Sequence, residues 1–396
     1  MPPPLVSSTA LETLSTETPP VAPSEPSEPR STLGSAAGPR PSLLRRYWLK
    51  TLVSLALAVL IAWGLKRSGF DVRPPSGEAF SRVSWSLYGL HVVILVVLHL
   101  FRAMRLRHLL HPIAPDFPNR RVLAAQWISF TAILLLPLRT GEVVRPYLLR
   151  DGKRITMSAA VGTTGAERVV DGLVVTILLA VTLLFVPHLE PLPKTIGDAK
   201  IPVAAIPVLG FTMLGVFTVL FAGMAFFYFQ PAFSRRMVLA TVGRVSPRIG
   251  AKLAGILSGI ADGLHFLSGP RHAVPFMAET LVYWALNATM MWVLGLAVGL
   301  SMTFGHACAV MGVLAIGILA PAGPGLYGVF QAATWGGLAM YFAPALILGK
   351  DSPGGVYVFL LYGTQFVWNL VAAAFSAAID PAMMRRATRS LTQPAT

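Results

Sequence analysis

Charged residues are scarce in this chain. Only 12% of the 396 residues are charged, whereas 54% are hydrophobic. Soluble domains of this length carry a much larger share of charged residues. Apolar runs long enough to cross about 30 Å of hydrocarbon recur along the sequence. The composition therefore predicts an all-α polytopic integral membrane protein.

Several kinds of chemistry are missing as well. Cys308 is the single cysteine, which excludes an intramolecular disulfide and a metal site built from cysteines. Neither a Walker motif nor zinc-ligand spacing occurs, so we expect no ATP hydrolysis, no metal and no cofactor. We find no catalytic motif and do not expect an enzyme. The net charge of +15 is typical of cytoplasmic loops in a membrane protein and does not require nucleic acid.

Composition divides the chain into three parts. Residues 1–44 are rich in Pro, Ser, Thr and Glu and cannot bury enough apolar surface to fold. We interpret them as a disordered cytoplasmic tail. Residues 45–385 form the predicted transmembrane domain, and 386–396 a short basic cytoplasmic tail.

Nine hydrophobic segments are visible, and the charges between them suggest which ones cross. The segments are 47–65, 83–101, 122–138, 168–187, 203–229, 275–299, 303–320, 325–348 and 356–379. Both flanks of 122–138 are basic, so a simple crossing there would place one basic flank on the wrong side. We therefore predict a re-entrant segment near 122–145 and about eight crossings. Both termini would be cytoplasmic, in a bacterial inner (plasma) membrane.

The end of the re-entrant segment carries charges beside helix breakers. Pro137 and Gly141 interrupt the apolar run, and Arg139, Glu142 and Arg145 surround them. A broken helix at membrane depth is tolerated only against protein or a wet cavity. Three residues apart, Glu142 and Arg145 can pair on one helix face, which would leave Arg139 for an anionic partner. Alternatively, these arginines lie in a cytoplasmic loop and only fix the topology.

A second charged group opens the next apolar segment. Glu167 and Asp171 are four residues apart, with Arg168 between them, so both carboxylates lie on one helix face. Unpaired carboxylates entering a membrane would cost on the order of several kcal/mol. We expect Arg139 or Arg145 to balance them. The alternative is a charge cluster wetted at the membrane surface.

Four stretches occur together in a recognisable order. They are "FRAMRLRHLL" (Phe101–Leu110), "PLRTGEVVRPYLL" (137–149), "GAERVVDGLVV" (Gly165–Val175) and "PAGPGLYGVFQAA" (Pro321–Ala333). Together they resemble the flippase-like membrane family named after the transmembrane part of lysylphosphatidylglycerol synthase. The resemblance covers about residues 45–385. It implies a membrane-embedded site for a lipid, with Arg102, Pro321, Gly325 and Gln331 as secondary candidate residues. Glu279 is a further secondary candidate, because it begins a polar stripe along one helix.

The chain departs from that family in two ways. Gln331 stands where the late motif usually carries a Glu, which puts an ion or proton role for that position in doubt. The sequence also ends without the soluble aminoacyl-transfer domain of lysylphosphatidylglycerol synthases, so we do not expect lipid aminoacylation.

The late motif shares its Pro-x-x-x-Gly pattern with the early one. Pro321 and Gly325 repeat the spacing of Pro137 and Gly141, as in transporters whose broken helices meet at the substrate. Close helix packing would explain the glycines equally well.

Two polar stripes should face the bundle interior: Glu279, Tyr283 and Asn287 in one helix, and Tyr362, Gln365, Asn369 and Ser376 in another.

The functional prediction follows from these groups. We expect a cavity containing Arg139, Gly141, Glu142, Arg145, Glu167, Arg168 and Asp171, which binds an anionic phospholipid or lipid-linked intermediate and moves it between leaflets. The first alternative is an accessory protein whose tail recruits a lipid-pathway or glycan-pathway enzyme. The second is a polyprenyl-dependent glycosyltransferase that uses Asp71 or Glu78 in the first external loop.

Overall fold

The described residues are mainly helical and contain no β-strand. The computed structural model describes residues 73–151, 154–196, 201–230, 269–320 and 322–392, with scattered positions between 52 and 63 and between 232 and 265. The α-helices are α2 (Gly77–Ser81), α3 (Trp85–Met104), α4 (Leu106–Leu110), α5 (Asn119–Leu135), α6 (Val144–Leu149), α7 (Met157–Phe185), α8 (Ile206–Phe229), α11 (Pro270–Ala297), α12 (Phe304–Gly317), α13 (Val329–Leu338), α14 (Pro344–Ile347), α15 (Pro353–Ile379) and α16 (Pro381–Thr392). Short 3₁₀ segments are η1 (Pro137–Val143), η2 (Val203–Ala205) and η4 (Pro324–Leu326).

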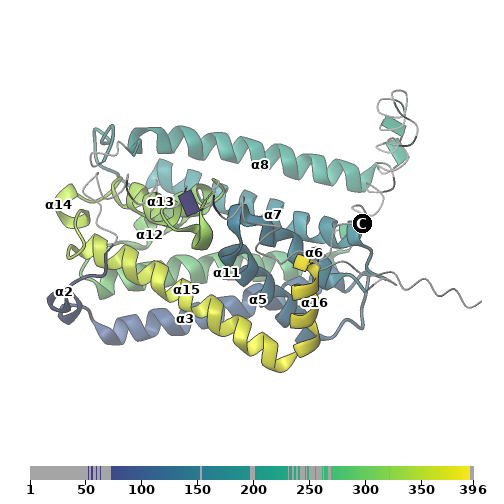
Figure 1. Cartoon of the computed structure of the whole chain (residues 1–396). Coiled ribbons are helices and arrows are strands. Elements are labelled where there is room, and N and C mark those ends of the chain that lie inside the picture. The colour runs from purple at the N-terminus through teal and green to yellow at the C-terminus, as the bar shows by residue number, and fades with distance from the viewer. Residues whose placement is uncertain are drawn as a thin grey trace, which may run out of the picture. The chain divides into compact units, whose positions relative to one another are not determined.

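Five helical stretches of the described chain are long and apolar enough to cross a membrane. They are Trp85–Leu110, Met157–Phe185, Val203–Phe229, Pro270–Ala297 and Pro353–Ile379. Each contains or overlaps a predicted hydrophobic segment, and the long helices run side by side in Figure 1. The fold is that of an all-α polytopic membrane protein, as predicted. The first predicted segment, 47–65, lies outside the described residues apart from scattered positions.

The segment predicted to be re-entrant forms a hairpin, which we call the first hairpin (α5–η1–α6). Helix α5 ends at Leu135, and Pro137 opens η1. A Cβ on Gly141 would lie 2.2 Å from the backbone carbon of Ala132, and the Arg145 guanidinium lies 5.0 Å from the Phe130 ring centre. Later residues thus contact earlier positions of α5, so the chain turns back along the helix it has just left.

The predicted segments 303–320 and 325–348 do not form two crossings. Helix α12 has 14 residues and α13 has 10, whereas about 20 are needed to span the hydrocarbon core. The His306 and Tyr341 rings stack 4.5 Å apart, and a Cβ on Gly337 would lie 3.0 Å from the Cα of Val310. The beginning of α12 therefore contacts the end of α13, so α12–η4–α13 forms a hairpin, which we call the second hairpin. The sequence pattern failed here because two short apolar helices joined by a Pro/Gly break resemble two spans.

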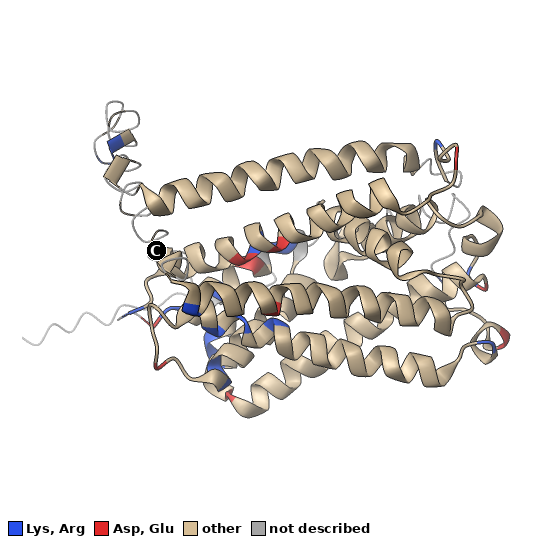
Figure 2. Ribbon diagram, turned by 180° about the vertical axis from the view of Figure 1, so that it is seen from behind, with Lys and Arg blue, Asp and Glu red and all other residues tan. Residues whose placement is uncertain are grey.

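The two hairpins enter the bundle from opposite ends. At the C-terminal end of α15, the Asp380 carboxylate lies 3.8 Å from the Nε of Arg121 in the first turn of α5. At the other end of α15, Gly354 packs against Ile347, which follows the second hairpin. The hairpin tips meet inside, because the Arg139 guanidinium donates a hydrogen bond of 2.5 Å to the Ile318 carbonyl. In Figure 2, charged positions gather at the bundle ends, and a further group lies along the helices inside.

The predicted domain boundaries are only partly covered. The expected tail 1–44 lies outside the described residues. Of the expected C-terminal tail 386–396, the residues up to Thr392 belong to α16. In Figure 1 this helix turns away from α15 towards α6. Buried Met383 and Ala387 on α16 belong to the same apolar cluster as Leu148 of α6, which explains why the chain stays helical there.

The close approach of η1 to α5 gives a test of the first hairpin. Replacing Gly141 with Ala would force its Cβ into the Ala132 backbone, and overpacking of this kind costs about 1–3 kcal/mol. We expect G141A to lower the temperature at which the detergent-solubilised protein aggregates. Gly215 of α8 has open space at its Cβ position, so G215A serves as the control and should leave that temperature unchanged. Equal behaviour of the two variants would contradict the hairpin packing.

Candidate functional site

The site is a cavity of about 570 Å³ where the two hairpins and the long helices meet. Its walls are mainly apolar, as the packing of α3, α5, α7, α8, α11, α12 and α15 requires. Polar side chains line it from α3, η1, α7, α11 and α15: His99, Arg102, Arg139, Glu142, Arg168, Asp171, Tyr283, Asn287, Tyr362, Gln365 and Asn369. Both predicted polar stripes thus contribute to the cavity, although Glu279 and Ser376 do not line it.

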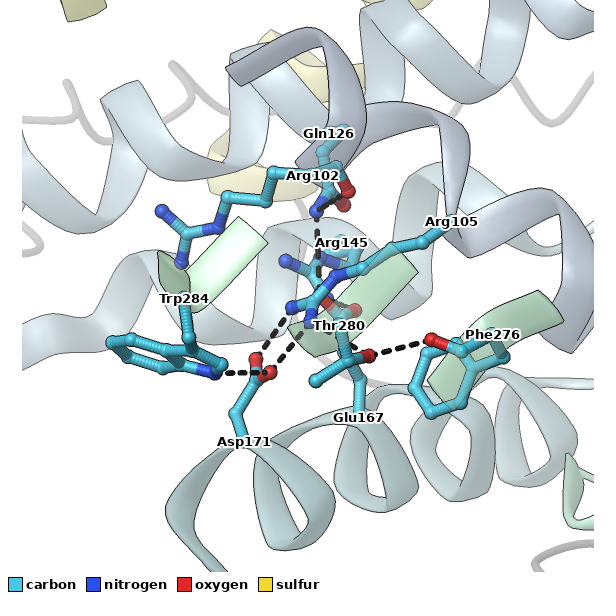
Figure 3. A network of polar contacts seen from close by, with 9 residues as sticks. All are labelled: Arg102, Arg105, Gln126, Arg145, Glu167, Asp171, Phe276, Thr280 and Trp284. Carbon is cyan, nitrogen blue, oxygen red and sulfur yellow. Dashed lines mark hydrogen bonds and ion pairs between the residues drawn. The ribbon is translucent and has the colours of Figure 1, made fainter. Parts of the chain in front are cut away.

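A fully buried arginine anchors one wall. Arg105, at the C-terminal end of α3, has no exposed surface. Its guanidinium binds both oxygens of Asp171, at 2.6 and 2.5 Å, and one oxygen of Glu167 at 2.8 Å (Figure 3). Two-pronged pairing of guanidinium with carboxylate is among the strongest polar contacts in proteins. Because Glu167 and Asp171 lie about 15–21 Å along α7 from its start, these charges are inside the bundle.

Further groups complete this network. Arg145 of α6 binds the second oxygen of Glu167 and is itself buried. The Trp284 indole donates a hydrogen bond of 3.3 Å to Asp171, and the Thr280 hydroxyl accepts one of 3.2 Å from Arg105. Figure 3 shows Trp284 beside Asp171 and Thr280 beside Arg105. Helices α3, α6, α7 and α11 are therefore joined through two carboxylates.

The tips of the two hairpins are joined by a different pair. Arg139 binds Glu142 at 3.0 Å through Nε and at 2.6 Å through Nη2. Its Nη1 donates to the Ile318 carbonyl at the end of α12, where a helix presents its negative end. Arg139 adopts φ 56°, a left-handed conformation that is uncommon outside glycine. Leu326 in the second hairpin adopts the same φ, so both breaks contain such a residue.

Two arginines on the cavity wall have no carboxylate partner among the described residues. These are Arg102 of α3 and Arg168 of α7. The Nε atom of each is buried and makes no hydrogen bond to the described chain. Both guanidinium groups approach the Phe130 ring, Arg102 at 3.4 Å and Arg168 at 5.3 Å from its centre. In Figure 3 no dashed line joins the Arg102 guanidinium to Glu167 or Asp171.

The structure changes several predicted pairings. Glu142 pairs with Arg139 and not with Arg145, because the 3₁₀ turn brings these two side chains together. Arg139 is therefore paired, whereas the sequence predicted that it would be free for an anionic partner. Glu167 and Asp171 share one helix face, as predicted. Arg145 does balance Glu167, whereas Arg139 does not take part.

The other predicted site residues lie in different places. Gly141 packs against α5 and does not line the cavity. Gly325 lines it with φ 76°. Gln331 is buried and accepts a hydrogen bond of 2.7 Å from the Gly328 amide, which caps α13. Glu279 binds His108 at 3.1 Å and Arg107 at 3.7 Å outside the cavity. Pro321 lies outside the described residues.

Sequence reasoning missed Arg105 altogether. It lies in a run of arginines, Arg102 to Arg107, that reads as a basic linker setting the topology. Two features of the sequence could have indicated Arg105. Glu167 and Asp171 together need more than one cation, and Arg105 lies one helical turn after Arg102, which was already a candidate residue. Phe130 was missed because one aromatic residue in an apolar helix carries no distinguishing mark.

Fold and site together define a polytopic membrane protein with a charged cavity inside its helical bundle. The chain belongs to the family of the lysylphosphatidylglycerol synthase transmembrane region, whose model matches residues 47–349. It is also similar to the glycosyltransferase AglD of Haloferax volcanii, with 24% identity over 362 residues and 89% of this chain. The chain spans about half the length of that relative, 53%. No solved structure gives a significant match.

The buried network predicts that Arg105 is essential for folding. R105Q would leave Asp171 without its ion-pair partner and Glu167 with Arg145 alone, and breaking a buried ion pair costs about 3–5 kcal/mol. We expect loss of monodisperse protein after extraction, measured by size-exclusion chromatography. The matched control is R107Q, because Arg107 is 44% exposed in its side chain. If R105Q is as well behaved as R107Q, the network does not hold the helices together.

Proposed function

We propose that the cavity binds the headgroup of an anionic lipid or lipid-linked intermediate, and that the chain moves this headgroup between leaflets. One observation carries the proposal: Arg102 and Arg168 line a cavity in a membrane protein without a carboxylate partner in the described chain. Cations inside a membrane bundle are costly, and such residues mark substrate pathways. Membership in the family and the apolar helices support action on lipids.

The geometry suits phosphate chemistry. Guanidinium groups match phosphate in shape and charge, and they stay protonated. Phe130 lies beside both guanidinium groups and limits where they can point. The carboxylates hold Arg105 and Arg145, so these two arginines act as the frame and Arg102 and Arg168 as the binding groups. Apolar wall residues such as Leu98 and Phe217 would face the acyl chains.

The hairpins supply a route from either side. Each approaches the cavity from one end of the bundle, and their tips touch through Arg139 and Ile318. Broken helices that meet at a substrate are a common transporter design. Movement of one hairpin at a time would open the cavity to one side, while the acyl chains remain in the bilayer.

A glycosyltransferase is the second candidate, and the name of AglD is the observation that favours it. That candidate would use Asp71 or Glu78. Asp71 lies outside the described residues, and Glu78 forms an exposed ion pair of 2.5 Å with Arg82.

An accessory role for the chain, recruiting an enzyme through residues 1–44, is the third candidate. Deleting that tail would abolish activity and preserve lipid binding if the accessory role holds.

Retained lipid tests the proposed site. We expect wild-type protein to co-purify with an anionic lipid class, and R102Q and R168Q to lose it by about tenfold, since a hydrogen bond to a charged group contributes about 1.5–3 kcal/mol. Mass spectrometry of the extracted lipids measures this. R120Q is the control, because Arg120 is exposed at the start of α5. Equal lipid content in all four proteins would overturn the proposal.

Two carboxylate variants separate translocation from glycosyl transfer. E142Q should slow headgroup movement in reconstituted vesicles, because Glu142 holds Arg139 at the contact between the hairpins. E78Q should leave movement unchanged. If E78Q abolishes the activity of the protein in its lipid or glycan pathway and E142Q leaves it unchanged, the glycosyltransferase candidate is favoured instead.

A further inference from the structure

The charges around the cavity do not balance. Five arginines and three carboxylates belong to the cavity wall and its buried frame: Arg102, Arg105, Arg139, Arg145 and Arg168 with Glu142, Glu167 and Asp171. Among the described residues this group therefore carries two more positive than negative charges. Water screens such an excess at a surface, whereas the interior of a bundle screens it far less.

The carboxylates are all engaged with other arginines. Asp171 takes both of its ion-pairing contacts from Arg105. Glu167 is shared by Arg105 and Arg145, and Glu142 binds Arg139. The excess charge can therefore be assigned to two side chains, Arg102 and Arg168, rather than spread over the group.

These two side chains converge on one place. They extend from different helices, α3 and α7, and both guanidinium groups lie close to the face of Phe130. Aromatic rings attract cations, but such contacts contribute only about 0.5–2 kcal/mol and add no negative charge. Since the guanidinium carbons lie 3.4 and 5.3 Å from one ring centre, they are at most 8.7 Å apart, a separation that suits a shared phosphate or diphosphate.

We propose that the ligand of this cavity carries at least two negative charges on its phosphate headgroup, either on one phosphate as in a lipid phosphomonoester or over two phosphates as in a lipid diphosphate. This inference rests on the proposed function and names its substrate class. A phosphomonoester carries about −1.5 to −2 charges near neutral pH. An ordinary phosphodiester lipid carries one negative charge on its phosphate and would leave one arginine of the pair uncompensated.

Matched lipids test the charge requirement. Purified full-length protein is titrated with phosphatidic acid, diacylglycerol diphosphate, phosphatidylmethanol and phosphatidylcholine, all with identical acyl chains. Native mass spectrometry gives the relative affinities. We expect the phosphomonoester and the diphosphate to bind about tenfold more tightly than phosphatidylmethanol, since each added charge-assisted contact contributes about 1.5–3 kcal/mol.

Variants assign the preference to the arginine pair. R168Q removes one positive charge and should bring phosphatidic acid and phosphatidylmethanol to nearly equal affinity. R168K keeps the charge and should restore the preference for phosphatidic acid. R120Q should behave as wild type. If R168Q does not fold, R102Q carries the same test from the other helix.

The outcomes separate this inference from the function on which it rests. If phosphatidylmethanol binds wild-type protein as tightly as phosphatidic acid, and both exceed phosphatidylcholine, the site takes anionic lipids but the two-charge requirement is wrong. A preference that survives in both R168Q and R102Q would also overturn the inference. If no anionic lipid exceeds phosphatidylcholine, the proposed function fails and this inference fails with it.

Discussion

Arg105, Glu167 and Asp171 form a buried ion-paired group that joins α3 to α7. These charges lie inside an apolar bundle, where any one of them alone would be costly. Their mutual geometry fixes the rotation and depth of α7 against α3. It also brings Trp284 of α11 into contact with Asp171. Arg105 and Arg145 form ion pairs with Glu167 and Asp171. Among the described residues, the neighbouring Arg102 and Arg168 therefore line the cavity without a carboxylate partner.

A second constraint concerns the backbone. Unpaired N–H and C=O groups cannot face lipid, so helix breaks at membrane depth need protein or water around them. The two hairpins meet this requirement jointly, since the carbonyl of Ile318 at the end of α12 accepts a hydrogen bond from Arg139 in the first break. The same contact places both breaks on the cavity wall. The contact between Arg139 and Ile318 therefore supports both helix breaks at the cavity wall.

The sequence predicted the fold class from its apolar segments, and the shared face of Glu167 and Asp171 from their four-residue spacing. It predicted the first hairpin from the basic flanks of 122–138 and the break at Pro137 and Gly141. It did not predict that 303–320 and 325–348 fold onto each other, since hydropathy cannot distinguish two spans from two half-length helices. The sequence also did not predict which arginine pairs with which carboxylate. Arg139, Arg145 and Arg105 all carry the same charge, and only the three-dimensional path of each helix decides which one meets which carboxylate.

In the proposed function a lipid phosphate occupies the space between Arg102 and Arg168 on the cavity wall. The most direct test of this claim is an experimental structure of the wild-type protein in lipid nanodiscs that contain anionic lipid. We expect density for a phosphate within hydrogen-bonding distance of both guanidinium groups, with acyl chains leading out to the bilayer. A cavity filled by acyl chains alone, with the headgroup bound elsewhere, would contradict the account.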